Sequence, residues 1–251
     1  MFEFHNQIMF PTHAVAPPGP LPPGATRVSI AAPDGNQLHG VHIAPGVGAP
    51  AGRTLILGFG GNAWNAEDAA SYLHNVFPVA DVVAFHYRGY HPSTGSPSAE
   101  VLLDDAPFVY DFAVSRLHPD QTIAVGFSIG SGVAAGLAQV RPVDGLILVT
   151  PFDSLKAVAS DLYPFLPVAT FFGDDMDAAA ALKGSKVPTA IIAAERDDIV
   201  PTRRTEALRA TVGNLIFDRT IANAGHNDIY ARSEFQRAMD DALAAVCEAY
   251  R

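Results

Sequence analysis

The chain has 251 residues, of which 49% are apolar and 17% charged, and its formal net charge is −10. A chain of this length and composition can bury a large core, which excludes global disorder and favours a single domain over residues 1–251. Its Lys and Arg residues are few and scattered, which argues against binding to nucleic acid or to anionic lipid surfaces.

The N-terminus and the cysteine content predict a cytoplasmic protein. Glu3 and His5 lie where a signal peptide would be apolar, and no basic region precedes them. No apolar run approaches the roughly 20 residues that span a bilayer. Cys247 is the single cysteine, so neither an intrachain disulfide nor a CxxC zinc site is possible. We expect no transmembrane segment, little membrane contact and no bound metal.

The predicted elements begin with an extended leader and a hairpin. Residues 1–24 form the leader, which is rich in proline around APPGPLPPG. Two β-like runs, residues 26–32 and 37–44, flank the sequence PDGN at residues 33–36. Asp, Gly and Asn tolerate the backbone angles of a tight turn. An antiparallel pair is therefore expected at the start of the sheet.

After this hairpin, short apolar runs alternate with helical stretches. Continuous apolar runs are typical of parallel strands that are buried on both faces. The predicted strands are residues 53–59, 82–87, 122–127, 145–150, 189–194 and 214–221, and the predicted helices are residues 66–76, 98–116, 131–140, 202–211 and 233–250. This order predicts an α/β fold, with a doubly wound, mostly parallel eight-stranded sheet and an antiparallel N-terminal hairpin.

A serine flanked by glycines joins the third of these later strands to a helix, in the sequence TIAVGFSIGSGVAAG. Gly126 and Gly130 leave room for a sharp turn that lifts the hydroxyl of Ser128 clear of the sheet, and Gly132 lets the helix pack closely. A bare GxSxG arises often by chance in a glycine-rich chain. The strand-to-helix context favours a nucleophile over a small residue in a crowded turn.

An acid and a base follow the last two predicted strands. A serine hydroxyl becomes nucleophilic when an imidazole takes its proton and a carboxylate orients that imidazole. His226 lies on the loop after the last strand, where a base would face the serine. Asp197 is the expected acid, with Asp198 and Glu195 as competitors and a helix cap as the alternative role. Asp228 is expected to cap a turn or to meet a cation.

Other residues at the strand ends complete the predicted site. The backbone N–H groups of Ile129 and Asn62 are expected to form an oxyanion hole, although a glycine turn between strand and helix would need the same sequence. The residues expected to contact the substrate are Gly61, His91, Phe165 and Leu166.

Seven motifs along nearly the whole chain carry a resemblance to a known family. They are PDGNQLHGVHIAP (33–45), GFGGNAW (58–64), FHYRGYHPSTGSPS (85–98), GFSIGSG (126–132), DLYPFLPV (161–168), ERDDIVP (195–201) and AGHNDIY (224–230). In these motifs the chain resembles the α/β-hydrolase fold serine hydrolases, and more narrowly their small, capless Bem46-like and ABHD13- and ABHD17-like branch. The resemblance implies a Ser-His-Asp triad at Ser128, His226 and Asp197.

The chain departs from that family's pattern at two places near the expected site. Gly60 stands where the family commonly has a histidine before Gly-Asn, and His91 stands where it commonly has a glycine after Tyr. The membrane-spanning or acylated N-terminal segment of many relatives is not expected here, so a depalmitoylase-like role is not carried over.

A short insertion at residues 154–184 is the expected lid. Within it, residues 162–173 carry no charge and are rich in Phe, Leu and Pro. By resemblance this stretch is a short helix and loop over the site. It would form an apolar acyl pocket or merely cover the edge of the sheet.

These features predict hydrolysis of an ester or thioester of modest acyl chain through an acyl-enzyme, without metal or organic cofactor. The substrate would be a small molecule, and the oligomeric state is left open. The alternatives are a small-peptide or amide hydrolase, an acyltransferase, and a non-catalytic ligand-binding module on the same fold.

Overall fold

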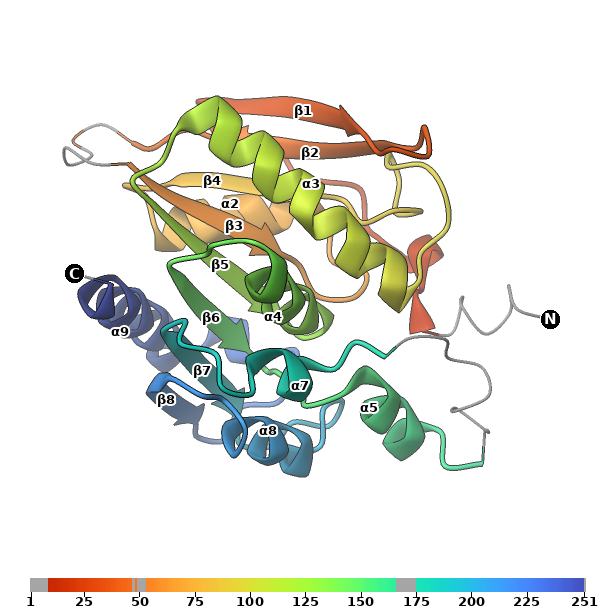
Figure 1. The fold of residues 1–251 in the computed structure, drawn as a ribbon, viewed down its shortest axis with the longest axis vertical. Coiled ribbons are helices and arrows are strands. Elements are labelled where there is room, and N and C mark those ends of the chain that lie inside the picture. The colour runs from red at the N-terminus through yellow and green to blue at the C-terminus, as the bar shows by residue number, and fades with distance from the viewer. Residues whose placement is uncertain (1–8, 47, 49–52, 166–174, 251) are drawn as a thin grey trace. The chain divides into compact units, whose positions relative to one another are not determined.

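The computed structural model describes residues 9–46, 48, 53–165 and 175–250. Contacts gather into two compact units, an N-terminal unit of residues 1–123 and a C-terminal unit of residues 124–251. The described strands form an eight-stranded, mostly parallel sheet in the order β1-β2-β4-β3-β5-β6-β7-β8 (Figure 1). The predicted fold class is therefore confirmed, whereas a single domain over residues 1–251 stays a prediction.

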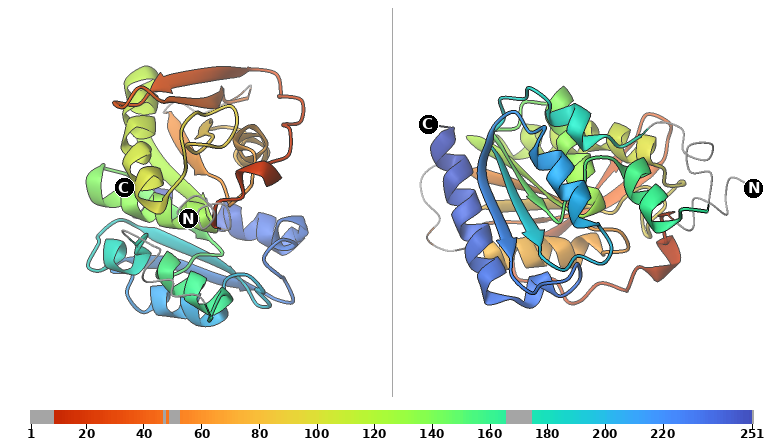
Figure 2. Two further views of the ribbon diagram at one scale, coloured as in Figure 1. Left: turned by 90° about the vertical axis from the view of Figure 1, so that its right-hand side faces the viewer. Right: turned by 90° about the horizontal axis from the view of Figure 1, so that it is seen from below.

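The N-terminal unit places helices on both faces of its strands. Strands β1 and β2 are antiparallel, β2 pairs antiparallel with β4, and β3 pairs parallel with β4. Helices α2 and α3 lie on opposite faces of these strands (Figures 1 and 2). The elements are η1 (Thr12–Ala14), β1 (Ala25–Ala31), β2 (Gln37–Ile43), β3 (Thr54–Phe59), α2 (Ala66–Val76), β4 (Asp81–Phe85) and α3 (Ala99–Leu117).

The hairpin forms for the reason that its sequence indicates. Gly35 adopts a φ of +86°, which a residue with a side chain rarely takes. The carboxylate of Asp34 accepts a hydrogen bond from the backbone N–H of Asn36 at 3.1 Å. These local interactions reverse the chain, so that Ala31 pairs with Gln37 in register. The predicted antiparallel pair is confirmed.

The leader is held against the N-terminal unit by hydrogen bonds to the segment that begins α2. The side chain of Asn62 donates to the carbonyl of Met9 at 2.6 Å, and that of Asn65 donates to the carbonyl of Ala16 at 3.1 Å. Phe10, which follows Met9 in the chain, is buried. These contacts give residues 9–18 a defined position over the loop that follows β3.

The C-terminal unit carries the rest of the sheet between α4 and α9. Strands β6, β7 and β8 are parallel neighbours, and α4 and α9 lie on opposite faces of them (Figures 1 and 2). The elements are β5 (Gln121–Phe127, shared with the N-terminal unit), α4 (Ile129–Val140), β6 (Gly145–Val149), α5 (Leu155–Leu162), α7 (Ala178–Leu182), β7 (Thr189–Ala194), α8 (Thr202–Arg209), β8 (Leu215–Ile221), η2 (Ile229–Ala231) and α9 (Ser233–Ala249).

The lid segment differs in part from its predicted form. Helix α5 occupies residues 155–162 and so ends at the first residue of the apolar stretch that was expected to be a short helix and loop, and α7 follows at residues 178–182. Ser154 caps α5 by accepting a hydrogen bond from the N–H of Ala157 at 3.1 Å. Most of the predicted lid stretch, residues 166–173, lies outside the described residues, and the role of the insertion as a lid stays a prediction.

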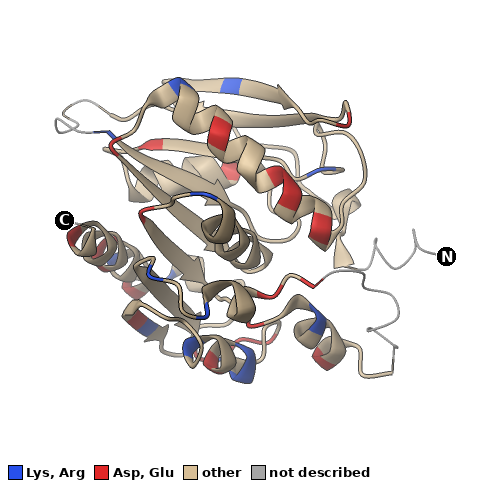
Figure 3. Cartoon of the chain, viewed as in Figure 1, with Lys and Arg blue, Asp and Glu red and all other residues tan. Residues whose placement is uncertain are grey.

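A buried ion pair joins the loop after β4 to α3 in the N-terminal unit. Acidic residues recur along α3 (Figure 3). Among them Asp105 is buried, with 6% of its surface exposed. Its carboxylate accepts two hydrogen bonds from Arg88, at 3.0 Å from Nε and 2.5 Å from Nη2. The guanidinium of Arg88 also contacts Asp34 in the hairpin turn. The guanidinium of Arg88 therefore connects the hairpin turn, the loop after β4 and α3.

Removing the carboxylate of this pair is expected to destabilise the protein strongly. Asp105→Ala would leave the buried guanidinium of Arg88 without its main partner, at a cost of about 3–5 kcal/mol in the free energy of unfolding. Urea denaturation measures this loss. Asp104→Asn is the matched control, because Asp104 is exposed on the same helix and should change stability by less than about 0.5 kcal/mol. Equal effects of the two substitutions would contradict the expectation.

Candidate active site

Ser128 lies on a strained turn between β5 and α4. Its backbone angles are φ 51° and ψ −116°, which are unfavourable for a residue with a side chain and cost on the order of 1–3 kcal/mol. A Cβ atom at Gly126 would lie only 2.3 Å from the carbonyl oxygen of Gly130, and one at Gly132 would lie 2.3 Å from the sulfur of Met176. The glycines around the serine are therefore required by the tight turn and by close helix packing.

The hydroxyl of Ser128 is not used to cap the helix that it precedes. Ser98 and Ser154 precede α3 and α5 with extended backbones, and each accepts a hydrogen bond from an N–H in the first turn. Ser128 has the same position before α4, but within the described helix its side chain makes no capping hydrogen bond. Its own N–H donates to the carbonyl of Val149 on β6 at 2.9 Å. The backbone is thus anchored while the hydroxyl is left for another role.

Asp197 and His226 are brought together by the loops after β7 and β8. The Nδ1 atom of His226 lies 2.9 Å from both carboxylate oxygens of Asp197, and His226 is 5% exposed. A carboxylate can only accept hydrogen bonds, so Nδ1 must carry the proton and Nε2 is the basic nitrogen. Ser128 lies on the turn between β5 and α4. For catalysis, its hydroxyl would have to contact Nε2 of His226.

Backbone hydrogen bonds fix the orientation of the Asp197 carboxylate. Its Oδ1 atom accepts from the N–H groups of Ile199 at 3.0 Å and Val200 at 2.7 Å. Glu195, which competed with it in the sequence, instead accepts from the N–H of Asn223 at 2.7 Å and so joins the two loops. Asp198 is exposed. Among these acids, Asp197 is the one that contacts the imidazole.

Asp228 stabilises the loop that carries His226. Its carboxylate accepts from the N–H of Gly225 at 2.6 Å and forms an ion pair with Arg232. These two contacts lower the pKa of Asp228, the hydrogen bond from Gly225 having the larger effect. Asp228 thus both closes a turn and meets a cation, the two roles expected of it.

The comparisons with known proteins place the chain in a family. A model described as the alpha/beta hydrolase fold matches residues 55–183, about half of the chain. The chain belongs to the alpha/beta hydrolase fold family. The match includes Ser128, whereas Asp197 and His226 lie beyond it. The Bem46-like branch stays a prediction.

Similar proteins include hydrolases and proteins described only as uncharacterized. A protein of Mycobacterium tuberculosis of the latter kind is 31% identical over 219 residues, covering 84% of this chain and 77% of the relative. The lysophosphatidylserine lipase ABHD12 of Danio rerio is 33% identical over 138 residues, which are 48% of this chain and 36% of the lipase.

Solved structures share the alpha/beta hydrolase fold over nearly the full chain. An alpha-beta hydrolase from Vibrio vulnificus has a TM-score of 0.72 at 21% identity, covering 98% of this chain and 92% of its own. The Pyrococcus furiosus esterase Pf2001 has a TM-score of 0.65 at 19% identity, covering 92% and 97%. The solved structures that share this fold thus include an esterase.

The two residues expected to form the oxyanion hole belong to different compact units. Ile129 is buried and begins α4, and the first N–H groups of a helix have no acceptor within it. The side chain of Asn62 is already engaged, because its Oδ1 accepts from the hydroxyl of Tyr90 at 2.6 Å and its amide holds Met9. A role for Asn62 would therefore fall to its backbone N–H. An oxyanion hole formed by the N–H groups of Ile129 and Asn62 stays a prediction.

The four residues expected to contact the substrate differ in their surroundings. Gly61 is buried and its carbonyl accepts from the N–H of Trp64 at 3.1 Å. His91 lines a pocket in the N-terminal unit. Phe165 is 96% exposed, and Leu166 lies outside the described residues. Substrate contact by any of them stays a prediction.

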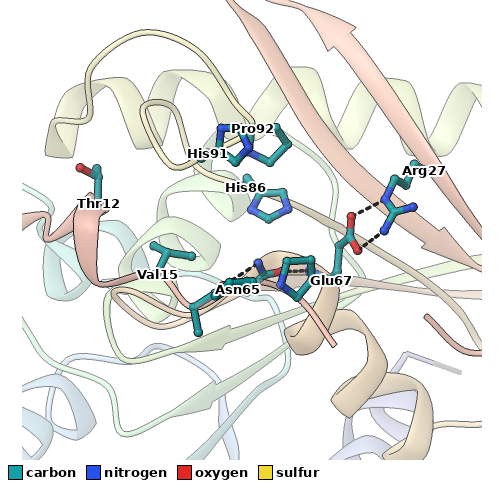
Figure 4. A pocket seen from close by; sticks show the side chains of 11 residues that line it. Thr12, Val15, Arg27, Asn65, Glu67, His86, His91 and Pro92 are labelled. Atoms are coloured by element: carbon teal, nitrogen blue, oxygen red, sulfur yellow. Dashed lines mark hydrogen bonds and ion pairs between the residues drawn. The ribbon is translucent and has the colours of Figure 1, made fainter. Parts of the chain in front are cut away.

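The pocket that His91 lines also contains His86, which directly follows β4 (Figure 4). His86 is 4% exposed, and neither of its ring nitrogens has a hydrogen-bond partner among the residues that the structure describes. Burial lowers the pKa of His86 to about 4, and His39 and His91 act in the same direction, against Glu67 and Asp68. The imidazole is therefore neutral at physiological pH.

The buried His86 should make the protein lose stability in mild acid. The unfolded chain binds a proton at its ordinary pKa near 6.5, above the folded value, so stability falls as the pH drops from 6.5 toward 4. His86→Leu removes this effect, and the decrease in free energy of unfolding from pH 7.5 to pH 5 should be smaller by about 2 kcal/mol than in wild type. Urea denaturation at both pH values measures it. Identical decreases in both proteins would contradict the low pKa.

Two further findings concern what the described residues do not contain. Across residues 9–46, 48, 53–165 and 175–250, no three His, Cys, Asp or Glu side chains are grouped so as to hold a metal ion. In the same part of the chain, no helix combines the length and apolarity needed to cross a membrane.

Proposed function

We propose that this protein is a serine hydrolase that cleaves a carboxylic ester or thioester of modest acyl chain through an acyl-enzyme on Ser128. The observation that carries the proposal is the strained, uncapped position of Ser128 at the start of α4. Strained backbone angles persist where the surrounding structure enforces them, and such residues cluster at active sites. The Asp197–His226 pair in the same compact unit supplies the other two members of a triad.

In the proposed reaction, Nε2 of His226 takes the proton of the Ser128 hydroxyl as the oxygen attacks the acyl carbon. The carboxylate of Asp197 keeps the Nδ1 proton in place and stabilises the imidazolium that forms. The negative oxygen of the tetrahedral intermediate would accept hydrogen bonds from the N–H groups of Ile129 and Asn62. His226 then protonates the leaving alcohol or thiol, and a water molecule activated in the same way releases the acid.

The relatives favour an acyl ester over other substrates. The Pyrococcus furiosus protein is described as an esterase and the Danio rerio protein as a lysophosphatidylserine lipase, and both names describe cleavage of an ester. The match covers 48% of this chain and 36% of the lipase, which supports an ester substrate but not that particular lipid. A small-peptide or amide hydrolase and an acyltransferase would use the same three residues.

A panel of p-nitrophenyl esters, from acetate to palmitate, tests the proposal together with labelling by a fluorophosphonate. We expect hydrolysis that favours the shorter esters, and mass spectrometry should find the label on the peptide that contains Ser128. Labelling without ester hydrolysis would point to an amide substrate or an acyl acceptor other than water. Neither hydrolysis nor labelling would overturn the proposal and favour the ligand-binding module.

A further inference from the structure

Hydrogen bonds from the loop after β4 and from the leader fix the loop that follows β3 in the N-terminal unit. The hydroxyl of Tyr87 donates to the carbonyl of Gly60 at 2.7 Å. The hydroxyl of Tyr90 donates to Oδ1 of Asn62 at 2.6 Å, and the amide of Asn62 donates to the carbonyl of Met9 at 2.6 Å. Both ends of the Asn62 side chain are therefore engaged, by two different segments of the chain.

The tyrosine that contacts Asn62 is itself held in place. Tyr90 is 2% exposed, and its ring packs edge-on against that of Tyr87 with the ring centroids 5.9 Å apart. Its backbone N–H donates to the carbonyl of Tyr87 at 2.9 Å. Burial raises the pKa of both hydroxyl groups, so each keeps its proton and remains a hydrogen-bond donor. Tyr90 thus offers Asn62 a donor at a defined position.

The turn that contains Asn62 leaves the backbone N–H of this residue without an acceptor. The carbonyl of Gly61 accepts from the N–H of Trp64 at 3.1 Å, which makes Asn62 the second residue of a β-turn. Ala63 has a φ of 61°, the positive value that the third residue of a type II turn requires. Within the part of the chain that the structure describes, the N–H of Asn62 donates to no other residue.

A side chain fixed at both ends is unusual for an exposed residue such as Asn62. An exposed amide can form its hydrogen bonds with water. Ordering it instead costs side-chain entropy and buries little apolar surface in return. The two contacts do, however, fix the residue whose backbone N–H is left without an acceptor, and this favours a role for that N–H group.

We propose that Tyr90 is a positioning residue for the oxyanion hole, which acts through the side chain of Asn62 to keep the backbone N–H of Asn62 directed at the negative oxygen. The inference rests on the proposed hydrolase function and adds a residue to it. Tyr90 itself would not contact the substrate. A donor that is already in position stabilises the developing charge without reorganisation, so its loss of position slows the reaction.

Tyr90→Phe removes the hydroxyl and keeps the ring. We expect kcat for p-nitrophenyl acetate to fall by about 10- to 100-fold, with KM changed by less than about threefold, since the N–H acts in the transition state. A short-chain trifluoromethyl ketone gives a second measurement, because its adduct with Ser128 carries a negative oxygen like that of the intermediate. Its inhibition constant should rise by about the same factor as kcat falls.

Tyr110→Phe is the matched control, because Tyr110 is also a buried tyrosine of the N-terminal unit but lies on α3. It should keep kcat and the inhibition constant of the ketone within about threefold of wild type. Urea denaturation of each variant shows whether it is folded.

A double-mutant cycle tests whether Tyr90 acts through Asn62. Asn62→Ala keeps the backbone N–H but removes both side-chain contacts, so it should lower kcat at least as much as Tyr90→Phe. The double variant should be no slower than Asn62→Ala, because the hydroxyl of Tyr90 has then already lost its acceptor. Asn62 is exposed, so Asn62→Ala supplies a test even if Tyr90→Phe is found to be unfolded.

The outcomes separate this inference from the hydrolase proposal. A wild-type protein that neither hydrolyses the ester nor binds the ketone would reject the hydrolase proposal, and this inference with it. If wild type does both, the inference alone is overturned by any one of four results: Tyr90→Phe keeps the wild-type kcat, Asn62→Ala does so, the two effects multiply in the double variant, or Tyr110→Phe lowers kcat as much as Tyr90→Phe.

Discussion

Replacing Ser128 with alanine is expected to lower kcat for p-nitrophenyl ester hydrolysis by about 10⁴-fold or more, with a much smaller change in KM. Alanine lacks the nucleophilic oxygen, and the imidazole of His226 then has no proton to take. Initial rates at saturating ester measure the effect. Residual hydrolysis within tenfold of wild type would place the activity at another residue and would reject Ser128 as the nucleophile.

A second substitution at this position separates catalysis from backbone strain. Ser128→Gly should be as inactive as Ser128→Ala, but glycine tolerates the φ of 51° that alanine does not. We therefore expect Ser128→Gly to be about 1 kcal/mol more stable than Ser128→Ala in urea denaturation. An alanine variant as stable as the glycine variant would show that the turn is not strained.

Asp197→Asn is expected to reduce kcat by about 10⁴-fold while the protein stays folded. The asparagine oxygen can still accept hydrogen bonds from the N–H groups of Ile199 and Val200, so its NH₂ group would face Nδ1 of His226. An NH₂ group donates, and the imidazole would have to move its proton to Nε2. Nε2 could then no longer accept the proton of Ser128.

The adjacent carboxylate provides the control for this prediction. Asp198 is exposed and next in the chain, so Asp198→Asn changes the local charge equally and should leave kcat within a few-fold of wild type. Steady-state kinetics of both variants measure the difference. If Asp198→Asn lowered kcat more than Asp197→Asn, Asp198 would be the carboxylate that orients His226. Equally small decreases in kcat for both variants would argue that neither carboxylate orients His226.

Much of the fold could be predicted because its determinants are local. Apolar runs such as residues 145–150 and 189–194 became the buried strands β6 and β7, and the Asp34-Gly35-Asn36 sequence formed the hairpin turn. Helices α5 and α7 were not predicted from periodicity. They span eight and five residues, and such short helices depend on packing more than on their own sequence.

The candidate site was predicted only as far as residue type and order along the chain allow. GFSIG between a strand and a helix indicated the turn at Ser128, and the positions of Asp197 and His226 after β7 and β8 indicated the acid and the base. The sequence alone determined these positions, because strand ends and turn conformations follow from neighbouring residues.

The tertiary structure decided which of these groups touch. It showed that Asp197 rather than Glu195 contacts His226 and that Arg88 and Asp105 form a buried pair. It also showed that the ring nitrogens of His86 are buried and have no hydrogen-bond partner in the described part of the chain. No local pattern encodes these outcomes. Burial and hydrogen bonding between residues far apart in the chain depend on how the packed elements meet, and that packing exists only in the folded protein.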